Sequence, residues 1–235
     1  MIGRMSSAQM HQGSLNVIFD AQARLQKTQE ALATGKKINE ASDDPVASAQ
    51  ITAVRAELSR LEVMQKNVNT AYDELAMTEA SLSSAEDLIS RAREISVQGA
   101  NSVLGAEDRA ILATEIDAIR DQLFKLANTQ SPMGDYIFAG HATDRPAFVD
   151  NAGNYEFEGD EGQRNVNIAA GVTVSVRTPG NQVFGEGETG IFEVLQNLAG
   201  GLRADEDEII QRSMTLFDDS QQLVLEGIAD LGSKM

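Results

Sequence analysis

The sequence predicts a mainly α-helical protein, built as a long antiparallel coiled-coil helical bundle with a small inserted β-hairpin domain. Three observations support this prediction. Residues 1–130 are rich in Ala, Leu, Gln and Glu and contain a single proline, whereas 12 of the 19 glycines and three of the four prolines lie in residues 131–201. On both sides of that glycine-rich segment, apolar residues recur at intervals of seven, which is the repeat of a coiled-coil seam.

The first predicted helix ends before Gly35. A set of its residues recurs every three or four positions and so shares one helix face, which includes Leu15, Ile18, Leu25 and Leu32. Gly35 follows this set, where a left-handed residue commonly ends a helix.

A second, much longer helix is predicted to begin at Pro45. Asp44 suits the N-cap, and Pro45 suits the first helical position, where a missing N–H costs nothing. The seam of this helix is a row of apolar residues spaced by seven, at Val54, Leu61, Val68, Leu75, Leu82 and Ile89. Small residues that allow close approach lie three positions after four of them, at Ala71, Thr78, Ala85 and Ala92.

Two further helices are predicted to share this seam. One lies in residues 106–130, where a turn around 101–105 reverses the chain, and the other runs from residue 205 to at least 231 with apolar residues at intervals of seven. The seam residues predicted to hold the bundle together are Leu61, Val68, Leu75, Leu82, Ile89, Leu112, Ile119, Leu123, Phe217 and Val224.

Between these helices the apolar period changes to two, which predicts strands at 136–138, 155–157, 166–168 and 172–176. Turn-forming residues at 150–153 and 169–171 suit two hairpins. A short amphipathic helix is predicted to lead back to the bundle, with its apolar face at Phe192, Leu195, Leu198 and Leu202.

Composition excludes several classes of function. The net charge of −17 repels phosphate backbones and anionic lipids, which argues against nucleic acid and membrane partners. The absence of cysteine excludes disulfides, thiolate metal sites and cysteine nucleophiles. No apolar run suits a cleavable signal or a membrane span.

Charge is unevenly distributed along the chain. Residues 1–66 hold 8 basic and 7 acidic residues, whereas the remaining 169 hold 11 and 29. A near-neutral amphipathic N-terminal third could pack against copies of itself while an acidic body stays solvated. A soluble coiled coil in which the uneven charge has no role in assembly explains the pattern equally well.

The candidate chemical sites favour structural interpretations. Residues 185–190 fit G-x-G-x-x-G, but two glutamates would face a pyrophosphate, so we interpret the segment as a glycine-rich link. His11 and His141 are the two histidines and lack a third metal ligand, and Ala152 occupies a position that a calcium loop needs for a ligand. We therefore predict no catalytic residue, no metal and no cofactor.

The acidic segment 205–208 could bind a hard cation, but a helix start explains it better. Asp205 at the N-cap and Glu208 three residues later would form a capping box, and acids there complement the helix dipole. We predict that this segment caps the last helix.

Several motifs resemble the flagellin superfamily. Residues 32–47, which include Asp43, Asp44 and Pro45, resemble its N-terminal motif, and the Asp-Asp-Pro-Val-Ala form is more similar to its junction proteins than to filament flagellins. Residues 135–140, 155–164 and 183–185 are similar to the hairpin insert of the hook-associated members. The motif positions are Gly35, Asn39, Asp43, Asp44 and Pro45.

The resemblance implies a flagellin-like core and a structural role without enzymatic activity. Its junction proteins form a ring that joins the bacterial flagellar hook, through a sister hook-associated protein, to the flagellin filament. They are secreted by the flagellar type III system with an uncleaved signal, which by analogy lies in residues 1–13. The implied partners are therefore copies of the same chain, the sister protein, flagellin and an export chaperone.

The resemblance also predicts a domain organisation and one departure from it. An export and polymerisation segment is expected at 1–45, a helical hairpin at 46–130, the insert at 131–203 and a returning helix at 204–235. In the family a further C-terminal helix follows. It binds the chaperone and covers the helix that matches 14–34. Because the sequence stops at Met235, we expect the face of Leu15 to be exposed, frayed or paired with another copy.

Two alternatives remain open from the sequence. A filament flagellin would share the predicted helices, although Pro45 and the small insert disfavour it. An extracellular binding module or enzyme would have its site in the β insert.

Overall fold

The computed structural model describes residues 7–235, with side chains from Met10 onward. The chain divides into two compact units, with the boundary between Glu62 and Val63. Residues 1–6, which begin the predicted export segment 1–13, lie outside the described part.

The N-terminal unit contains α1 (Ser7–Thr34) and the start of α2 (Pro45–Gly99). Gly35 has a φ of 65°, which confirms the predicted left-handed end of the first helix. The Asp44 carboxylate accepts hydrogen bonds from the backbone N–H groups of Val46 and Ala47 at 3.1 and 3.0 Å, and α2 begins at Pro45. The predicted helix start is therefore confirmed.

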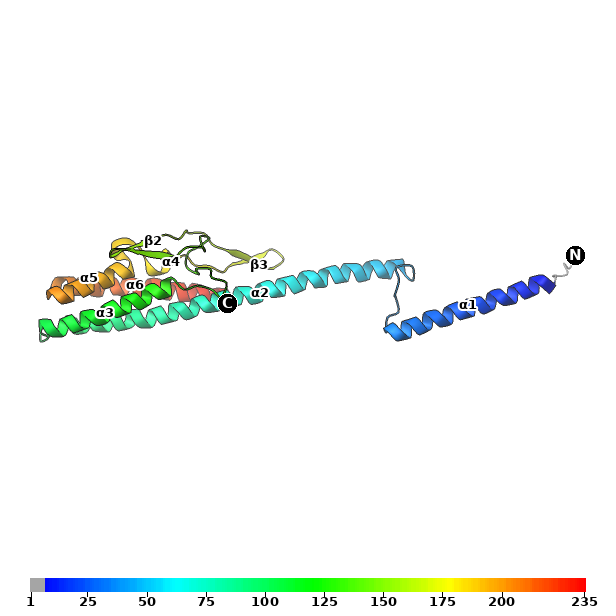
Figure 1. The fold of residues 1–235 in the computed structure, drawn as a ribbon, viewed down its shortest axis with the longest axis horizontal. Coiled ribbons are helices and arrows are strands. Elements are labelled where there is room, and N and C mark those ends of the chain that lie inside the picture. The colour runs from blue at the N-terminus through cyan, green and yellow to red at the C-terminus, as the bar shows by residue number, and fades with distance from the viewer. Residues whose placement is uncertain (1–6) are drawn as a thin grey trace. The chain divides into compact units, whose positions relative to one another are not determined.

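The second unit is a helical bundle. The later part of α2, α3 (Ala106–Ala127), α5 (Ile191–Ala204) and α6 (Asp207–Lys234) run alongside one another (Figure 1). The predicted small seam positions, Ala71, Thr78, Ala85 and Ala92, are all buried. The mainly α-helical bundle with a small hairpin insert is confirmed.

Helix α5 contributes more to the bundle than the sequence predicts. It packs closely against α3 and α6, and its apolar residues Phe192, Leu195, Leu198 and Leu202 are all buried. A Cβ at Gly201 would lie 2.8 Å from the Ile209 side chain, so glycine lets the turn between α5 and α6 close tightly. The bundle core therefore has four helices instead of the three expected.

The insert contains two separate antiparallel hairpins. β1 (Phe148–Asn151) pairs with β2 (Asn154–Phe157), and β3 (Asn165–Ala169) pairs with β4 (Val172–Ser175) around an irregularity between Asn167 and Ala169. Both predicted turns are confirmed, and β1 is an additional strand. The short helices α4 (Gly180–Phe184) and η1 (Gly187–Thr189) then lead to α5.

The strand predicted at 136–138 is wrong. Tyr136 forms only an isolated bridge with Gln130, and the following backbone groups bond to irregular segments instead of a neighbouring strand. Phe138 O accepts from Gly180 N at 2.8 Å, and Asp160 N donates to Ala139 O at 3.1 Å. Consecutive residues of this segment, Ile137, Phe138 and Ala139, are all buried, and the Phe138 ring lies 5.3 Å from the Phe184 ring, so the segment packs into the core without forming a sheet.

An aromatic cluster joins the insert to the bundle. Phe192 of α5 lies 5.1 Å from Phe148, 5.3 Å from Tyr155 and 5.9 Å from Phe124 of α3, measured between ring centroids. The Asn128 side chain, just after α3, also donates to Phe148 O at 2.9 Å and accepts from Phe148 N at 3.0 Å. These contacts fix the first hairpin on the bundle.

We expect Gly140→Ala to destabilise the insert. Gly140 has a φ of 69°, and an added Cβ would clash with the backbone carbonyl of Asp160, which cannot move as a flexible side chain could. Positive φ and the clash together should cost about 2 kcal/mol or more in the free energy of unfolding, measured by urea denaturation. Gly171→Ala is the matched control, because Gly171 has a φ of 76° but nothing within 4 Å of the added Cβ. Equal losses for the two variants would contradict the steric argument.

Candidate functional site

The motif loop between α1 and α2 is organised around Asp43. Its Oδ2 accepts hydrogen bonds from the backbone N–H groups of Asn39 and Glu40, both at 3.2 Å, and its Oδ1 pairs with Lys27 Nζ at 2.5 Å. The ammonium of Lys27 and these backbone donors hold the pKa of the Asp43 carboxyl below its ordinary value. The loop is thus shaped by the motif residues Asn39, Asp43, Asp44 and Pro45. Their role in assembly stays a prediction.

The loop should lose its order at low pH. Because the folded pKa of Asp43 is depressed, its stabilising effect is present above the unfolded value of about 3.8 and is lost as pH falls through the folded pKa. Backbone amide shifts of Asn39 and Glu40, followed by NMR, should report this transition below pH 4. Asp43→Asn should abolish it, and Lys27→Gln should move it upward. A transition that persists unchanged in Asp43→Asn would refute the assignment.

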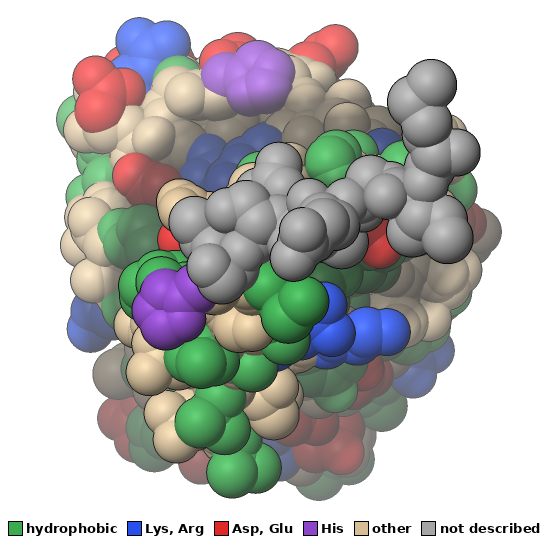
Figure 2. Space-filling view, turned by 90° about the vertical axis from the view of Figure 1, so that its right-hand side faces the viewer, with side chains coloured by type: hydrophobic (Ala, Val, Ile, Leu, Met, Phe, Trp, Pro, Cys, Tyr) green, Lys and Arg blue, Asp and Glu red, His purple; other side chains and the backbone are tan. Residues whose placement is uncertain are grey.

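A row of large apolar residues is exposed along the N-terminal unit. Val17, Ile18, Phe19 and Leu25 of α1 are more than half exposed, and Leu32 is 84 % exposed. The row extends into the start of α2 with Val46, Val54, Leu58 and Leu61. Figure 2 shows hydrophobic side chains at the surface of the described residues. Of the three outcomes predicted for the face of Leu15, the structure shows exposure, whereas pairing with another copy stays a prediction.

The ten predicted seam residues, which lie on α2, α3 and α6, differ in how far they are buried. Leu61 and Val68 are exposed at 51 % and 37 %, and Leu112 is partly buried against the core. The other seven are buried together in the bundle: Leu75, Leu82, Ile89, Ile119, Leu123, Phe217 and Val224. The seam repeat thus continues from the packed bundle onto an exposed helix surface.

Arg109 ties together the two turns at one end of the bundle. Its side chain is 4 % exposed, pairs with Asp205 at 2.5 Å and Asp207 at 2.8 Å, and also donates to Asn101 O at 3.5 Å. No local motif predicts a role for Arg109, although it lies seven residues before Ile116 and so shares its register.

The capping role predicted for Asp205 and Glu208 is wrong. Asp205 is the left-handed C-cap residue of α5, with a φ of 58°, and its carboxylate is turned to Arg109. Glu206 precedes α6 without a side-chain capping bond. The tight reversal between α5 and α6 therefore uses this acidic segment for an ion pair across the bundle.

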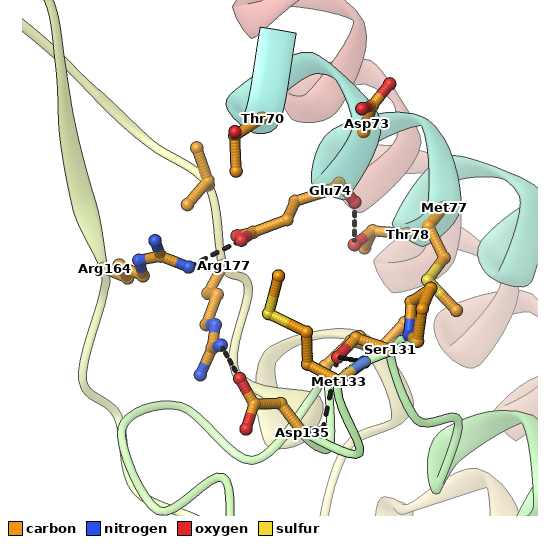
Figure 3. Close-up of a pocket in the computed structure, with 13 residues that line it drawn as sticks. Thr70, Asp73, Glu74, Met77, Thr78, Ser131, Met133, Asp135, Arg164 and Arg177 are labelled. Atoms are coloured by element: carbon orange, nitrogen blue, oxygen red, sulfur yellow. Dashed lines mark hydrogen bonds and ion pairs between the residues drawn. The ribbon is translucent and has the colours of Figure 1, made fainter. Parts of the chain in front are cut away.

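A groove lies between α2 and the insert, with a cavity volume of about 470 Å³. Two ion pairs cross or border it: Arg164 contacts Glu74 of α2 at 2.5 Å, and Arg177 contacts Asp135 at 3.1 Å (Figure 3). Asn67 of α2 also donates to Asn167 O of β3 at 3.1 Å. These polar contacts link the second hairpin to α2. No local pattern predicts them, because they join residues far apart in the chain.

The other candidate sites have structural surroundings. Residues 185–190 follow helix α4, whereas a dinucleotide-binding turn follows a strand. The backbone N–H of His141 donates to Asp160 at 2.7 Å, and His11 lies exposed on α1. Within the described residues, no cluster of acidic or histidine side chains could hold a metal ion. No helix in residues 7–235 is both long and apolar enough to span a membrane.

Comparisons with known proteins agree with this architecture. Residues 5–143 match the family model for the bacterial flagellin N-terminal helical region. Flagellar hook-associated protein 3 of Escherichia coli K12 is 35% identical over 152 residues, which cover 65% of this chain and 48% of that protein. The Salmonella typhimurium LT2 protein of the same name is 32% identical over 181 residues, covering 77% and 56%. The chain thus spans about half the length of these curated relatives.

A solved structure shares the fold over most of the chain. A protein described as a flagellar hook-associated protein from Vibrio parahaemolyticus superposes with a TM-score of 0.78 at 26% identity, covering 83% of this chain and 88% of that one. The sequence motifs, the exposed helix surface, the family match and this fold agree, and the chain therefore belongs to the bacterial flagellin family.

Proposed function

We propose that the chain is a structural subunit of the bacterial flagellum, placed at the junction between hook and filament. The observation that carries the proposal is a packed bundle whose coiled-coil repeat continues onto the exposed surface formed by Val54, Leu61 and Val68. Exposed apolar rows of this kind are interaction surfaces. The names of the two curated relatives, both flagellar hook-associated protein 3, support the junction as the place of assembly.

The mechanism that we propose is mechanical. Long packed helices resist bending, and ion pairs such as Arg91–Glu115 and Arg93–Asp218 link α2 to its neighbours in the bundle. Repeated contacts between equivalent surfaces would then arrange the subunits as a closed ring. The ring would join a sister hook-associated protein on one side to flagellin on the other.

Export completes the proposal. The chain would leave the cell through the flagellar type III system, using an uncleaved signal in residues 1–13 and a dedicated chaperone. The domain roles follow from this assignment, with 1–45 for export and polymerisation, 46–130 and 204–235 for the rod, and 131–203 for the insert, whose last helix, α5, packs into the rod.

Immunogold labelling of flagella from the source bacterium would test the proposal. An antibody against the purified chain should label one narrow zone between hook and filament. Labelling along the whole filament would instead support a filament flagellin, and flagella without any label would overturn the structural role. An antibody against flagellin provides the control for accessibility of the filament.

A further inference from the structure

We propose that the groove between α2 and the insert receives residues 32–37 of a second copy of this chain. This inference rests on the proposed function, because it requires the chain to assemble with itself. It adds which surfaces meet: the groove of one copy and the end of α1 of the next.

The groove offers an adaptable apolar wall. Met77, Ile137 and Val176 line it, and Met133 stands at its edge with 88 % of the side chain exposed. Methionine side chains adapt to differently shaped partners, which suits a surface that opens to a neighbour. A cavity of about 470 Å³ has room for a large aliphatic side chain.

The lining of the groove has more acidic than basic side chains, which favours a cationic neighbour. Three carboxylates line it, from Asp73, Glu74 and Asp135, against two arginines. Both arginines are already engaged, Arg164 with Glu74 and Arg177 with Asp135 (Figure 3). The second oxygen of Glu74, Oε2, is buried without a hydrogen-bond partner. A lysine from outside would balance the excess negative charge.

Residues 32–37 of another copy have the complementary chemistry. Leu32 is 84 % exposed, more than any other large apolar side chain described on α1. Lys36 and Lys37 lie just after the end of α1, and both are exposed. Neither forms an ion pair within the described residues. Leucine would enter the apolar part of the groove while a lysine approaches Asp73, the exposed carboxylate of the lining that forms no ion pair within the described residues.

Long-range charge favours this pairing over contact between two bodies. Residues 1–62 hold 7 basic and 7 acidic residues, whereas residues 63–235 hold 12 and 29. Two strongly acidic bodies repel each other, but the neutral unit of one copy can approach the acidic body of the next. The contact is heterologous, since different surfaces meet, and such contacts close into a ring when the rotation between copies permits.

Crosslinking between copies can test the contact, because the natural sequence contains no cysteine. Leu32→Cys and Met133→Cys chains are mixed and treated with a short bismaleimide, and covalent dimers are counted by denaturing electrophoresis. The control pairs Leu32→Cys with Val172→Cys, since Val172 is exposed at 48 % but does not line the groove. The groove pair should give roughly tenfold more dimer than the control, because docking raises the local thiol concentration.

A charge variant tests the cationic part. Lys36→Glu combined with Lys37→Glu in the Leu32→Cys chain should reduce the crosslinked dimer to the control level. A yield that is unchanged would overturn the role of the lysines.

Sedimentation of the same mixtures separates this inference from the proposed function. Chains that associate but crosslink no better than the control would overturn the groove contact alone. Preferential crosslinking of Met133→Cys to a cysteine at Val103, on the body, would also overturn it. Chains that never associate, together with flagella that carry no label, would overturn the proposed function as well.

Discussion

Leu75→Asp should unfold much of the bundle. Leu75 is 2 % exposed and lies in the seam of α2, so the new carboxylate would be buried without a partner. We expect a loss of roughly 3 to 5 kcal/mol in the free energy of unfolding, because an uncompensated buried charge is among the most destabilising changes. Urea denaturation followed by circular dichroism would measure it.

Leu61→Asp provides the matched control for this prediction. Leu61 has the same position in the seven-residue repeat, two heptads earlier, but its side chain is 51 % exposed. The free energy of unfolding of this variant should stay within about 0.5 kcal/mol of the parent, as for most surface substitutions. If Leu75→Asp were equally mild, the seam would be wrongly assigned.

Phe192→Ala should detach the insert from the bundle. The ring is 1 % exposed and touches the rings of Phe148, Tyr155 and Phe184, so truncation leaves a cavity between the two parts. Replacing a buried phenylalanine by alanine costs roughly 3 to 5 kcal/mol, and the lost edge and tilted ring contacts add to that cost. Urea denaturation would give the loss. Tyrosine fluorescence in a background with Tyr72→Phe and Tyr136→Phe, where Tyr155 is the one tyrosine left in the chain, would show whether the first hairpin separates early.

Phe19→Ala is the control for the aromatic cluster. Phe19 is 62 % exposed on α1, and its truncation should change the free energy of unfolding by no more than about 0.5 kcal/mol. A similar loss in both variants would mean that the cluster is not the main contact between insert and bundle.

Much of the fold can be predicted from local signals. The helix before Gly35, the start of α2 at Asp44 and Pro45, and the hairpin turns at 150–153 and 169–171 each depend on neighbouring residues. Capping, turn formation and periodicity act over one or two turns of chain, so these elements need no tertiary information.

The candidate functional surfaces could be predicted only in part. Exposure of the α1 face was one of three outcomes expected from the family resemblance. The groove was not expected, because Arg164 and Glu74 are 90 positions apart and nothing local indicates that they meet. The seven-residue repeat gives Leu61 and Leu75 equivalent positions, so it cannot predict that Leu61 is exposed and Leu75 is buried.

Long helices with a seven-residue apolar repeat, on either side of a glycine-rich hairpin insert, can be read from the amino-acid sequence alone. Three features became evident from the folded chain: α5 enters the core, Asp205 turns to Arg109 instead of capping α6, and 136–138 packs without forming a strand. The reason is physical: helix and turn propensities are set by neighbouring residues, whereas burial and ion pairing depend on what the rest of the chain brings alongside.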